Sequence, residues 1–428
     1  MTNLLITRRA AGCSMALTLA ACAGLHPPIG TPGAMPQNSA LAMRANATTY
    51  KLLHAFAGFP DGAFPRASLV DVGGTLYGTT DNGGSVYCYG TADNSCGTVF
   101  SVTTGGTETV LHSLGHRHDG RHPAAALIEV AGKLYGTTTG GGNTKSGTVI
   151  RLTTGGMEKV VYSFGGSPDG AEPQAALLDV GGTLYGTTYL GGVYTTSDGF
   201  TGGTVFSVTT GGTEKVLHSF GHGIDGSAPR AALVGVAGTL YGTTVGGGAY
   251  GRGTVFSITP SGSEKVLHSF GKRNRTDGAA PGASLIEVNG TLYGTTPVGG
   301  AYDKCGRRGA CGGTVFSITP SGTEKILHSF GNGTDGAIPN APLIEVKGKL
   351  YGTTSGGGST SYCRSGGCGT IFSITTDGRE RVLYSFGNAN DGYAGDPEAG
   401  LIALNGTLYG TTYGGGSEGW GTVFSLKL

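Results

Sequence analysis

The 428-residue sequence contains little charge and few aromatic side chains: Asp, Glu, Lys and Arg account for 13% of it, and Phe, Trp and Tyr for 8%. The 28 Lys and Arg residues nearly cancel the 27 Asp and Glu residues. A near-neutral chain lacks the basic surface of nucleic-acid-binding proteins and the high net charge of most disordered proteins. After the first 22 residues, no run of 18 apolar residues offers a segment that would cross a bilayer as a helix.

Glycine is the residue in large excess, with 85 copies in the chain, where an ordinary globular protein has about 7%. Collagen is excluded because these glycines do not recur at every third position and only 17 prolines accompany them. The hydrophobic fraction of 38% is enough for a large core at this length. A globular fold with many tight turns would account for the glycine excess.

The first residues have the pattern of an export signal. Arg8 and Arg9 precede a short apolar run that ends in Leu-Ala-Ala-Cys at Cys22. This ending resembles the bacterial lipobox, in which the cysteine is lipidated and becomes the new N-terminus after cleavage. We therefore expect residues 1–22 to be a lipoprotein signal peptide, with lipidation at Cys22.

Residues 23–49 are rich in proline and small polar residues and lack any periodicity, which is typical of a flexible stalk. Ala23, rather than an aspartate, follows the lipidated cysteine, and in a Gram-negative lipoprotein this would direct sorting to the outer membrane. We expect a bacterial cell-envelope protein that is held at the outer membrane by its lipid alone and faces the periplasm or the cell surface.

Six cysteines remain after the leader, and they fall in three close pairs, each within one Gly-rich loop. In an exported protein this spacing favours disulfides, each stabilising its loop by about 2 kcal/mol. A zinc site is disfavoured because structural zinc prefers two to four residues between paired cysteines and four converging ligands. The predicted disulfides are Cys88–Cys96, Cys305–Cys311 and Cys363–Cys368.

Four short elements recur seven times through the rest of the chain. Each consists of Leu, β-branched and aromatic residues bounded by Gly, Asn, Asp or Pro, which is typical of β-strands. In chain order they read Leu-Ile-Glu-Val, Leu-Tyr-Gly-Thr-Thr, Gly-Thr-Val-Phe and Leu-His-Ser-Phe. Pairs such as Asn289-Gly290 and Ser261-Gly262 join the first element to the second and the third to the fourth, as in tight hairpins. The second element begins at Leu76, Leu134, Leu184, Leu240, Leu292, Leu350 and Leu408.

Seven units of four antiparallel strands predict an all-β fold, a seven-bladed β-propeller over residues 50–428. The ordered chain opens with a lone fourth element at residues 50–56 and closes with the first three elements. This permutation predicts that the N-terminal strand joins the C-terminal three and closes the ring, which leaves no open sheet edge. The predicted blade units lie near residues 66–114, 124–164, 174–220, 230–270, 282–330, 340–386, and 398–428 together with 50–56.

The repeated segments GTLYGTT, GTVFSITPSG and EKVLHSFG resemble the GloVer tandem repeat of exported bacterial proteins, and the resemblance covers residues 50–428. That resemblance implies export and supplies no reaction, because the family has no assigned activity. The segment GKLYGTTTGGG is also similar to part of the kelch propeller repeat. The kelch tryptophan of the fourth strand is absent, since Trp420 precedes a third element, so no kelch ligand residue is transferred to this chain.

Tight hairpins trim one face of the predicted disc, so the opposite face collects the longer loops, where recognition usually lies. We call it the loop face. Aromatic rings there suit stacking on sugars or anchoring a protein partner, although they also suit packing over blade edges. Cations there suit an anionic glycan or lipid headgroup, or simply form a solvated rim. The predicted ligand-binding residues are Tyr89, Tyr189, Tyr194, Tyr250, Lys304, Arg307, Arg308, Tyr362, Tyr413 and Trp420.

Histidines are the one weak metal candidate. His116, His118 and His122 lie close together in one loop, but loop histidines without an orienting second shell are usually incidental, so we expect no metal and no cofactor. The histidine of the fourth element and an Asp-Gly pair recur from unit to unit. Their repetition indicates structural hydrogen bonding and turn formation.

No nucleophile elbow, His-Glu-x-x-His motif or phosphate loop occurs, and no Ser, His and Asp stand apart from the repeat as a unique set. The sequence therefore favours a monomeric binding or scaffold module for a glycan or an envelope protein, with no nucleic-acid partner. The alternatives are a polysaccharide lyase or glycosidase, and a purely structural surface protein.

Overall fold

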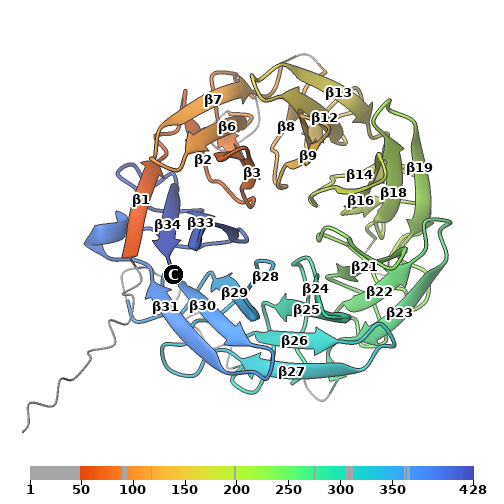
Figure 1. The fold of residues 1–428 in the computed structure, drawn as a ribbon. Helices are drawn as coiled ribbons and strands as arrows, with labels where there is room; N and C mark the ends of the chain where they lie inside the picture. The colour runs from red at the N-terminus through yellow and green to blue at the C-terminus, as the bar shows by residue number, and fades with distance from the viewer. Residues whose placement is uncertain are drawn as a thin grey trace, which may run out of the picture. The chain divides into compact units, whose positions relative to one another are not determined.

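A computed structural model describes residues 49–88, 95–116, 118–196, 199–272, 276–303, 312–360, 363 and 367–428. These residues form seven four-stranded antiparallel sheets arranged radially around a central axis (Figure 1). The predicted seven-bladed propeller is confirmed. Residues 1–48, which include the predicted signal peptide, Cys22 and all but the last residue of the predicted stalk, lie outside the described residues.

Each blade runs outward from a short inner strand beside the axis to a long outer strand at the rim (Figure 1). From the inner to the outer strand, the blades are as follows: blade 1, β3 (Val70–Val72), β4 (Thr75–Thr80), β6 (Thr98–Thr103) and β7 (Glu108–Ser113); blade 2, β9 (Ile128–Val130), β10 (Lys133–Thr138), β12 (Thr148–Thr153) and β13 (Glu158–Ser163); blade 3, β15 (Leu178–Val180), β16 (Thr183–Thr188), β18 (Thr204–Thr209) and β19 (Glu214–Ser219); blade 4, β20 (Val234–Val236), β21 (Thr239–Thr244), β22 (Thr254–Ile258) and β23 (Glu264–Ser269); blade 5, β24 (Ile286–Val288), β25 (Thr291–Thr296), β26 (Thr314–Ile318) and β27 (Glu324–Ser329); blade 6, β28 (Ile344–Val346), β29 (Lys349–Thr354), β30 (Thr370–Thr375) and β31 (Glu380–Ser385); blade 7, β32 (Ile402–Leu404), β33 (Thr407–Thr412), β34 (Thr422–Lys427) and β1 (Thr49–Ala55).

The ring closes in blade 7, as the order of the repeats predicts. β1 pairs with β34 in antiparallel register from Thr49 opposite Lys427 to Ala55 opposite Thr422. Just past β1, the Phe56 N–H donates to the Gly421 carbonyl at 3.0 Å. The first described strand and the last thus share one sheet, and no strand of that blade is missing.

The hydrophobic core lies between neighbouring blades. Phenylalanines just after the outer strands and on the third strands are fully buried, and across most blade boundaries they meet edge to face at centroid distances of 5.0 to 5.3 Å. This geometry is favourable for aromatic rings. The glycine of Leu-Tyr-Gly-Thr-Thr is required here, because a Cβ on Gly242 would come within 2.6 Å of the Phe256 ring. The pairs are Phe56–Phe100, Phe164–Phe206, Phe220–Phe256, Phe270–Phe316, Phe330–Phe372 and Phe386–Phe424.

The two threonines of each Leu-Tyr-Gly-Thr-Thr segment have separate roles. The second, such as Thr244, bonds to a threonine of the third strand in its own blade, here Thr254 at 2.8 Å. The first donates its hydroxyl hydrogen to an alanine carbonyl of the next blade. These buried bonds join all seven blades into a ring: Thr79 to Ala125, Thr137 to Ala175, Thr187 to Ala231, Thr243 to Ala283, Thr295 to Ala341, Thr353 to Ala399 and Thr411 to Ala67.

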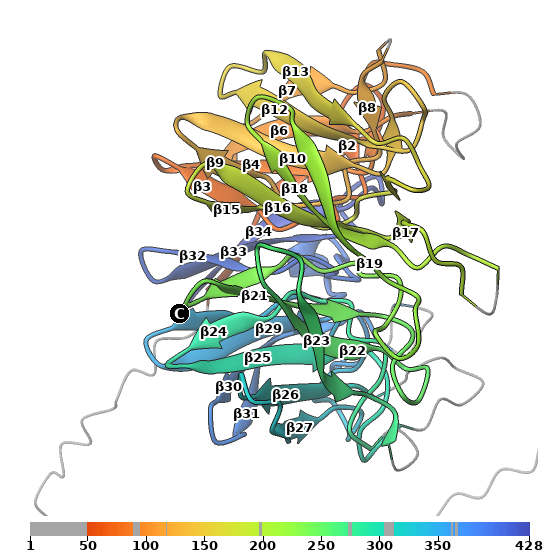
Figure 2. The same ribbon diagram turned by 90° about the vertical axis from the view of Figure 1, so that its right-hand side faces the viewer.

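The loop face carries short two-stranded sheets in addition to its loops. They are β2 (Gly62–Ala63) with β5 (Asn82–Gly83), β8 (Gly120–Arg121) with β11 (Gly140–Gly141), and β14 (Gly170–Ala171) with β17 (Leu190–Gly191). Figure 2 shows the disc from the side, with tight hairpins at its left and longer connections, including β8 and β17, at its right. The structure therefore has the trimmed face and the loop face that the sequence predicts.

Candidate functional site

The repeated histidines and aspartates pair with one another at the blade boundaries. At six of the seven boundaries, a His or Tyr of the outer strand bonds to the Asp of the following Asp-Gly pair, as His112 Nε2 does to Asp119 Oδ2 at 3.0 Å. The Asp also accepts hydrogen bonds from nearby backbone N–H groups, such as that of Gly120 at 2.7 Å. The other bonded pairs are His54–Asp61, Tyr162–Asp169, His218–Asp225, His328–Asp335 and Tyr384–Asp391. In the seventh pair, His268 Nε2 lies 3.4 Å from Asp277 Oδ2.

A glutamate from the next blade faces six of these seven pairs, a feature that sequence reasoning missed. One carboxylate oxygen of each glutamate is shielded from solvent and has no hydrogen-bond partner. Partial burial is the chief reason that the pKa of each rises to about 7: Glu108, Glu158, Glu214, Glu264, Glu324 and Glu380. At the seventh boundary, Tyr50 takes this place and stacks on Tyr384 at 4.4 Å. Burial raises the pKa of the Tyr50 hydroxyl.

Side chains that differ between the repeats gather around the axis on the loop face. In each blade, a residue just before a proline adopts a positive φ, between 53° and 58°. Backbone hydrogen bonds hold this residue. The Phe64 N–H, for example, donates to the Trp420 carbonyl, and the Phe64 carbonyl accepts from the Asp81 N–H. The side chains themselves vary: Phe64, His122, Glu172, Ala228, Ala280, Ile338 and Asp396.

Two positions further along, a second ring of varied residues lines a narrow axial cavity of about 130 Å³. This ring consists of Arg66, Ala124, Gln174, Arg230, Gly282, Asn340 and Glu398. A repeated backbone therefore presents non-repeated side chains around the axial opening.

The axial cluster, which we define as Phe64, Arg66, Glu398, Tyr413 and Trp420, joins blades 7 and 1. The Arg66 guanidinium lies over the Tyr413 ring at 4.5 Å, and its Nη1 is 3.7 Å from Glu398 Oε2. Phe64 stacks on Tyr413 at 4.6 Å and meets Trp420 edge to face at 5.1 Å. Burial raises the pKa of Glu398, while the nearby Arg66 charge opposes this rise.

A cleft of about 830 Å³ lies beside the axial cluster on the loop face. We call it the blade 6–7 cleft. Tyr393, which is 46% exposed, and Asp396, whose pKa is raised by burial, both line it. The remaining lining is mainly backbone: Cys363, Gly392, Gly395, Gly414, Gly415, Gly416, Ser417 and Gly419.

The blade 6–7 cleft exists because this connection departs from the repeat. The positive-φ residue Asp396 lies five positions after Asp391, whereas Phe64 lies three positions after Asp61. The longer connection contains the 3-10 turn η2 (Ala389–Asp391), which the Asn388 side chain caps. Symmetry is thus broken at this boundary by inserted chain, and Asp396 belongs to both the cleft and the axial ring.

The structure brings together two of the predicted ligand-binding residues, Tyr413 and Trp420. The Arg230 guanidinium lies 4.6 Å from the centre of the Tyr189 ring, and the Tyr194 and His222 ring centroids are 5.0 Å apart. Both tyrosines follow β16. Tyr250, which is 49% exposed, lies in the loop after β21. These three therefore come from blades 3 and 4 and do not join the axial cluster. Tyr89, Lys304, Arg307, Arg308 and Tyr362 lie outside the described residues.

Sequence reasoning missed Phe64 and Arg66. The available signal was their departure from the equivalent positions of the other repeats, which an alignment of the seven units against one another would have revealed.

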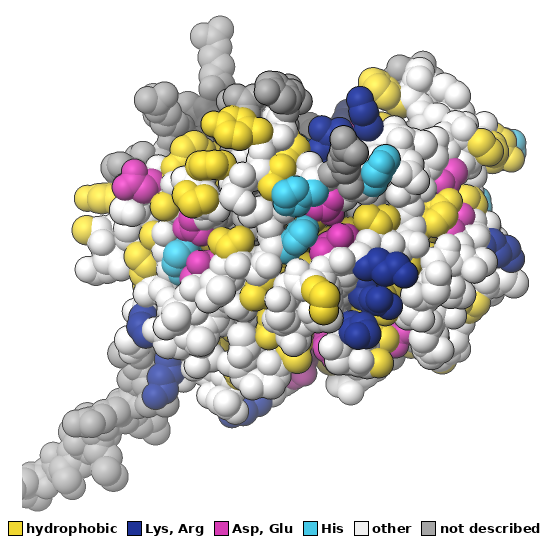
Figure 3. Space-filling model, turned by 90° about the horizontal axis from the view of Figure 1, so that it is seen from above, with side chains coloured by type: hydrophobic (Ala, Val, Ile, Leu, Met, Phe, Trp, Pro, Cys, Tyr) yellow, Lys and Arg dark blue, Asp and Glu magenta, His cyan; other side chains and the backbone are white. Residues whose placement is uncertain are grey.

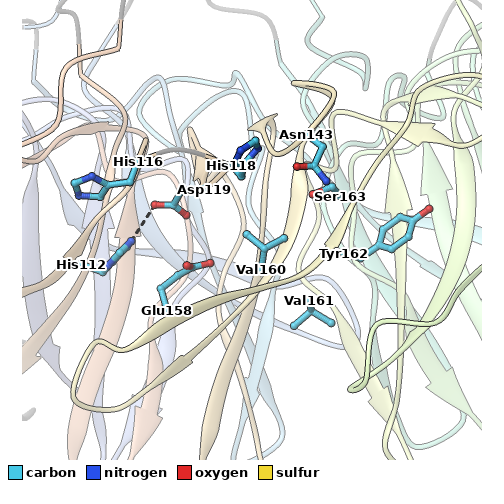
Figure 4. Close-up of a pocket in the computed structure, with 10 residues that line it drawn as sticks. All are labelled: His112, His116, His118, Asp119, Asn143, Glu158, Val160, Val161, Tyr162 and Ser163. Carbon is cyan, nitrogen blue, oxygen red and sulfur yellow. Dashed lines mark hydrogen bonds and ion pairs between the residues drawn. The ribbon is translucent and has the colours of Figure 1, made fainter.

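The three predicted metal candidates divide between two places. His122 Nδ1 bonds to the Asp81 carbonyl at 3.0 Å, and the Asp81 side chain raises the pKa of His122. His116 and His118 lie instead at the rim, beside a cavity of about 600 Å³ (Figure 4). Figure 3 shows histidine and acidic side chains gathered on this edge of the disc. His122 therefore does not lie with His116 and His118.

Two of the predicted disulfides are present in loops between the second and third strands. They are Cys88–Cys96, with a Cα separation of 5.5 Å, and Cys363–Cys368, with 5.1 Å. The predicted Cys305–Cys311 pair lies outside the described residues. In the described part of the chain, no helix is long and apolar enough to cross a membrane.

Comparison with protein families agrees with the repeated architecture. A family model described as the Gloeobacter/Verrucomicrobia repeat matches residues 36–200, 86–307 and 306–428. No curated protein sequence matches the chain. Among solved structures, the tricorn protease is similar at 10% identity and a TM-score of 0.40, over 81% of this chain and 27% of that one. A luciferin-regenerating enzyme is similar at 13% identity and a TM-score of 0.42, over 77% of this chain and 95% of that one. The N-terminal domain of Nup159 is similar at 11% identity and a TM-score of 0.45, over 90% of this chain and 97% of that one. This chain therefore spans only about a quarter of the tricorn protease chain.

Proposed function

The chain belongs to the Gloeobacter/Verrucomicrobia repeat family, and we propose that this member is a binding module that recognises a glycan in the blade 6–7 cleft. The observation that carries the proposal is the cleft itself, which lies where the repeat symmetry is broken. It combines an exposed tyrosine ring, a carboxylate and exposed backbone. Aromatic faces stack on sugar rings, and carboxylates accept hydrogen bonds from sugar hydroxyls.

The walls of the blade 6–7 cleft are held rigidly, which favours binding. The Gly414 N–H donates to the Gly395 carbonyl at 3.1 Å, and the Gly416 N–H donates to the Gly392 carbonyl at 3.0 Å. A side chain on Gly415 has no room, because its Cβ would lie 2.3 Å from the Ala394 Cα. The Cys363–Cys368 disulfide further fixes the adjacent loop. A preorganised cleft loses little conformational entropy when a ligand binds.

Replacing Tyr393 with alanine is expected to weaken glycan binding by about 10- to 100-fold, because a central aromatic contact is lost. Asp396→Asn should weaken it by removing the carboxylate charge. A glycan array would identify a ligand for the whole protein, and titration calorimetry would then compare the variants. Tyr250→Ala is the matched control, since Tyr250 is similarly exposed but lies in blade 4. An array without any bound glycan, or a Tyr393→Ala affinity equal to that of the unchanged protein, would refute the proposal.

We further propose that this monomeric module is exported and held at the outer membrane by a lipid on Cys22. The two disulfides support export, because such bonds persist in oxidising compartments. Cys22→Ala should release the protein from the membrane fraction of bacteria that express it and abolish incorporation of labelled palmitate. Equal membrane retention and labelling in the variant would contradict this anchor.

A further inference from the structure

We propose that His112, Asp119 and Glu158 bind a divalent transition-metal ion such as Zn²⁺ at the rim between blades 1 and 2. His112 is the next-to-last residue of the outer strand β7, Asp119 belongs to the following connection, and Glu158 begins the outer strand β13 of the next blade. One ligand atom from each residue lies within 4.8 Å of the other two. This site is separate from the blade 6–7 cleft and does not depend on the glycan proposal.

The spacing of the donor atoms suits a small ion. Zn²⁺ binds nitrogen and oxygen at about 2.0 to 2.2 Å, so neighbouring ligand atoms of a tetrahedral site lie about 3.3 Å apart. His112 Nε2 and Asp119 Oδ2 are 3.0 Å apart. A bound ion would replace the proton that these two atoms share, and it would bind the lone pair of Nε2 on the neutral imidazole.

Glu158 supplies the third ligand. Its Oε1 is shielded from solvent and has no hydrogen-bond partner among the described residues, and the carboxylate lies beside the His112–Asp119 pair. Figure 4 shows this side chain rising toward Asp119 from the strand of the neighbouring blade. A buried polar atom without a partner is costly, and a cation between the two carboxylates would remove that cost.

The second carboxylate oxygen of Asp119 is already positioned. Asp119 Oδ1 accepts a hydrogen bond from the Gly120 N–H at 2.7 Å, and only 7% of the residue is exposed. The backbone that follows is held by the β8–β11 pair. Such outer-shell contacts orient metal ligands, so Oδ2 stays directed at the proposed ion.

Access and a further ligand are also available at this boundary. The cavity of about 600 Å³ opens beside the three residues, and the exposed His116 and His118 line it (Figure 4). The His116 ring centroid lies 6.3 Å from that of His112, so a side-chain rotation would bring it to the ion as a fourth ligand. Imidazole ligands favour zinc, cobalt, nickel or copper over calcium and magnesium.

Other blade boundaries serve as internal references. Tyr162 and Tyr384 replace the histidine at two boundaries and still bond to their aspartates. At the boundary after blade 3, His218, Asp225 and Glu264 repeat the residue types. Among the described residues, however, ligand atoms converge in this way only at the proposed site and at His54, Asp61 and Glu108, and not at His218. His118 distinguishes the boundary between blades 1 and 2, because His222 takes the position of His116 at the boundary after blade 3.

The test uses the whole protein, stripped with EDTA and titrated with Co²⁺ and Zn²⁺. We expect binding by calorimetry and a visible Co²⁺ absorption band. His112→Tyr should weaken Zn²⁺ binding by at least about ten-fold and remove the Co²⁺ band. The fold accepts tyrosine at this position in blades 2 and 6, so the Asp119 bond should be kept. Glu158→Gln should also weaken binding.

The matched controls are His218→Tyr and Glu264→Gln, which make the same changes at the boundary after blade 3 and should leave metal binding unchanged. If the unchanged protein binds neither ion at 100 μM, the proposal fails. It also fails if His112→Tyr and Glu158→Gln, shown to be folded by circular dichroism, bind Zn²⁺ as tightly as the unchanged protein.

Discussion

Deleting residues 1–56 is expected to abolish cooperative folding of the propeller. The deletion removes β1, leaving blade 7 with three strands and exposing the backbone edge of β34. It also removes Tyr50, Leu53 and Phe56 from the core. Burying such side chains contributes about 1.5 to 3 kcal/mol each, and the whole domain is stable by only about 5 to 15 kcal/mol. An exposed strand edge additionally favours aggregation.

Calorimetry and size-exclusion chromatography would test this prediction. The shortened chain should show no single unfolding transition and should elute as aggregate. A chain that begins at Asn46 keeps every described strand and is the control, which should unfold in one transition. If the chain without residues 1–56 unfolds at the same temperature as the control, β1 does not hold the ring closed.

Raising the pH from about 5.5 to about 8.5 in EDTA is expected to lower the melting temperature by about 3 °C or more. The cause is a set of four glutamates at the blade boundaries where, among the described residues, no His, Asp and Glu ligand atoms converge. Their pKa values lie at about 7 in the folded protein, chiefly because of burial, against 4.5 for an ordinary glutamate: Glu214, Glu264, Glu324 and Glu380.

The sign follows from proton binding. Between the unfolded pKa and the folded pKa, the folded state holds more protons, so each glutamate contributes stability that is fully present below about pH 4.5 and is lost as the pH rises through about 7. Burial also raises the pKa values of Asp396 and Glu398, which adds to the trend. Burial lowers the pKa of His268, so this one group makes stability rise with pH and opposes the trend.

Replacing these glutamates with glutamine one at a time should reduce the pH dependence in proportion to the number replaced. Scanning calorimetry at five pH values for the one-, two- and four-fold variants would measure this. A melting temperature that rises with pH, or a slope that is unchanged in the four-fold variant, would show that these carboxyls do not control stability.

Much of the fold was predictable because its determinants are local and repeated. Alternating apolar residues form strands, Asn-Gly and Gly-Gly pairs form hairpins, and these patterns occur seven times with a known phase. The lone strand at residues 50–56 therefore indicated the ring closure that β1 and β34 make. Closely spaced cysteines in the same way indicated Cys88–Cys96 and Cys363–Cys368, because these bonds close short loops.

The sites depend on contacts between blades, and for these the sequence gives no distance. Glu158 meets a histidine 46 positions earlier, and Arg66 reaches Glu398 and Tyr413 across the closed ring. His122 shares a loop with His116 yet lies apart from it, where its ring bonds to the Asp81 carbonyl.

By itself, the sequence determined the number of blades, their strands, the closing strand and the two disulfides, since hydrogen bonding and side-chain alternation act over a few residues. Only the tertiary structure decided which side chains share a cleft or an ion site. Radial packing places each blade against the next at a fixed angle, and this geometry brings residues from separate repeats within contact distance.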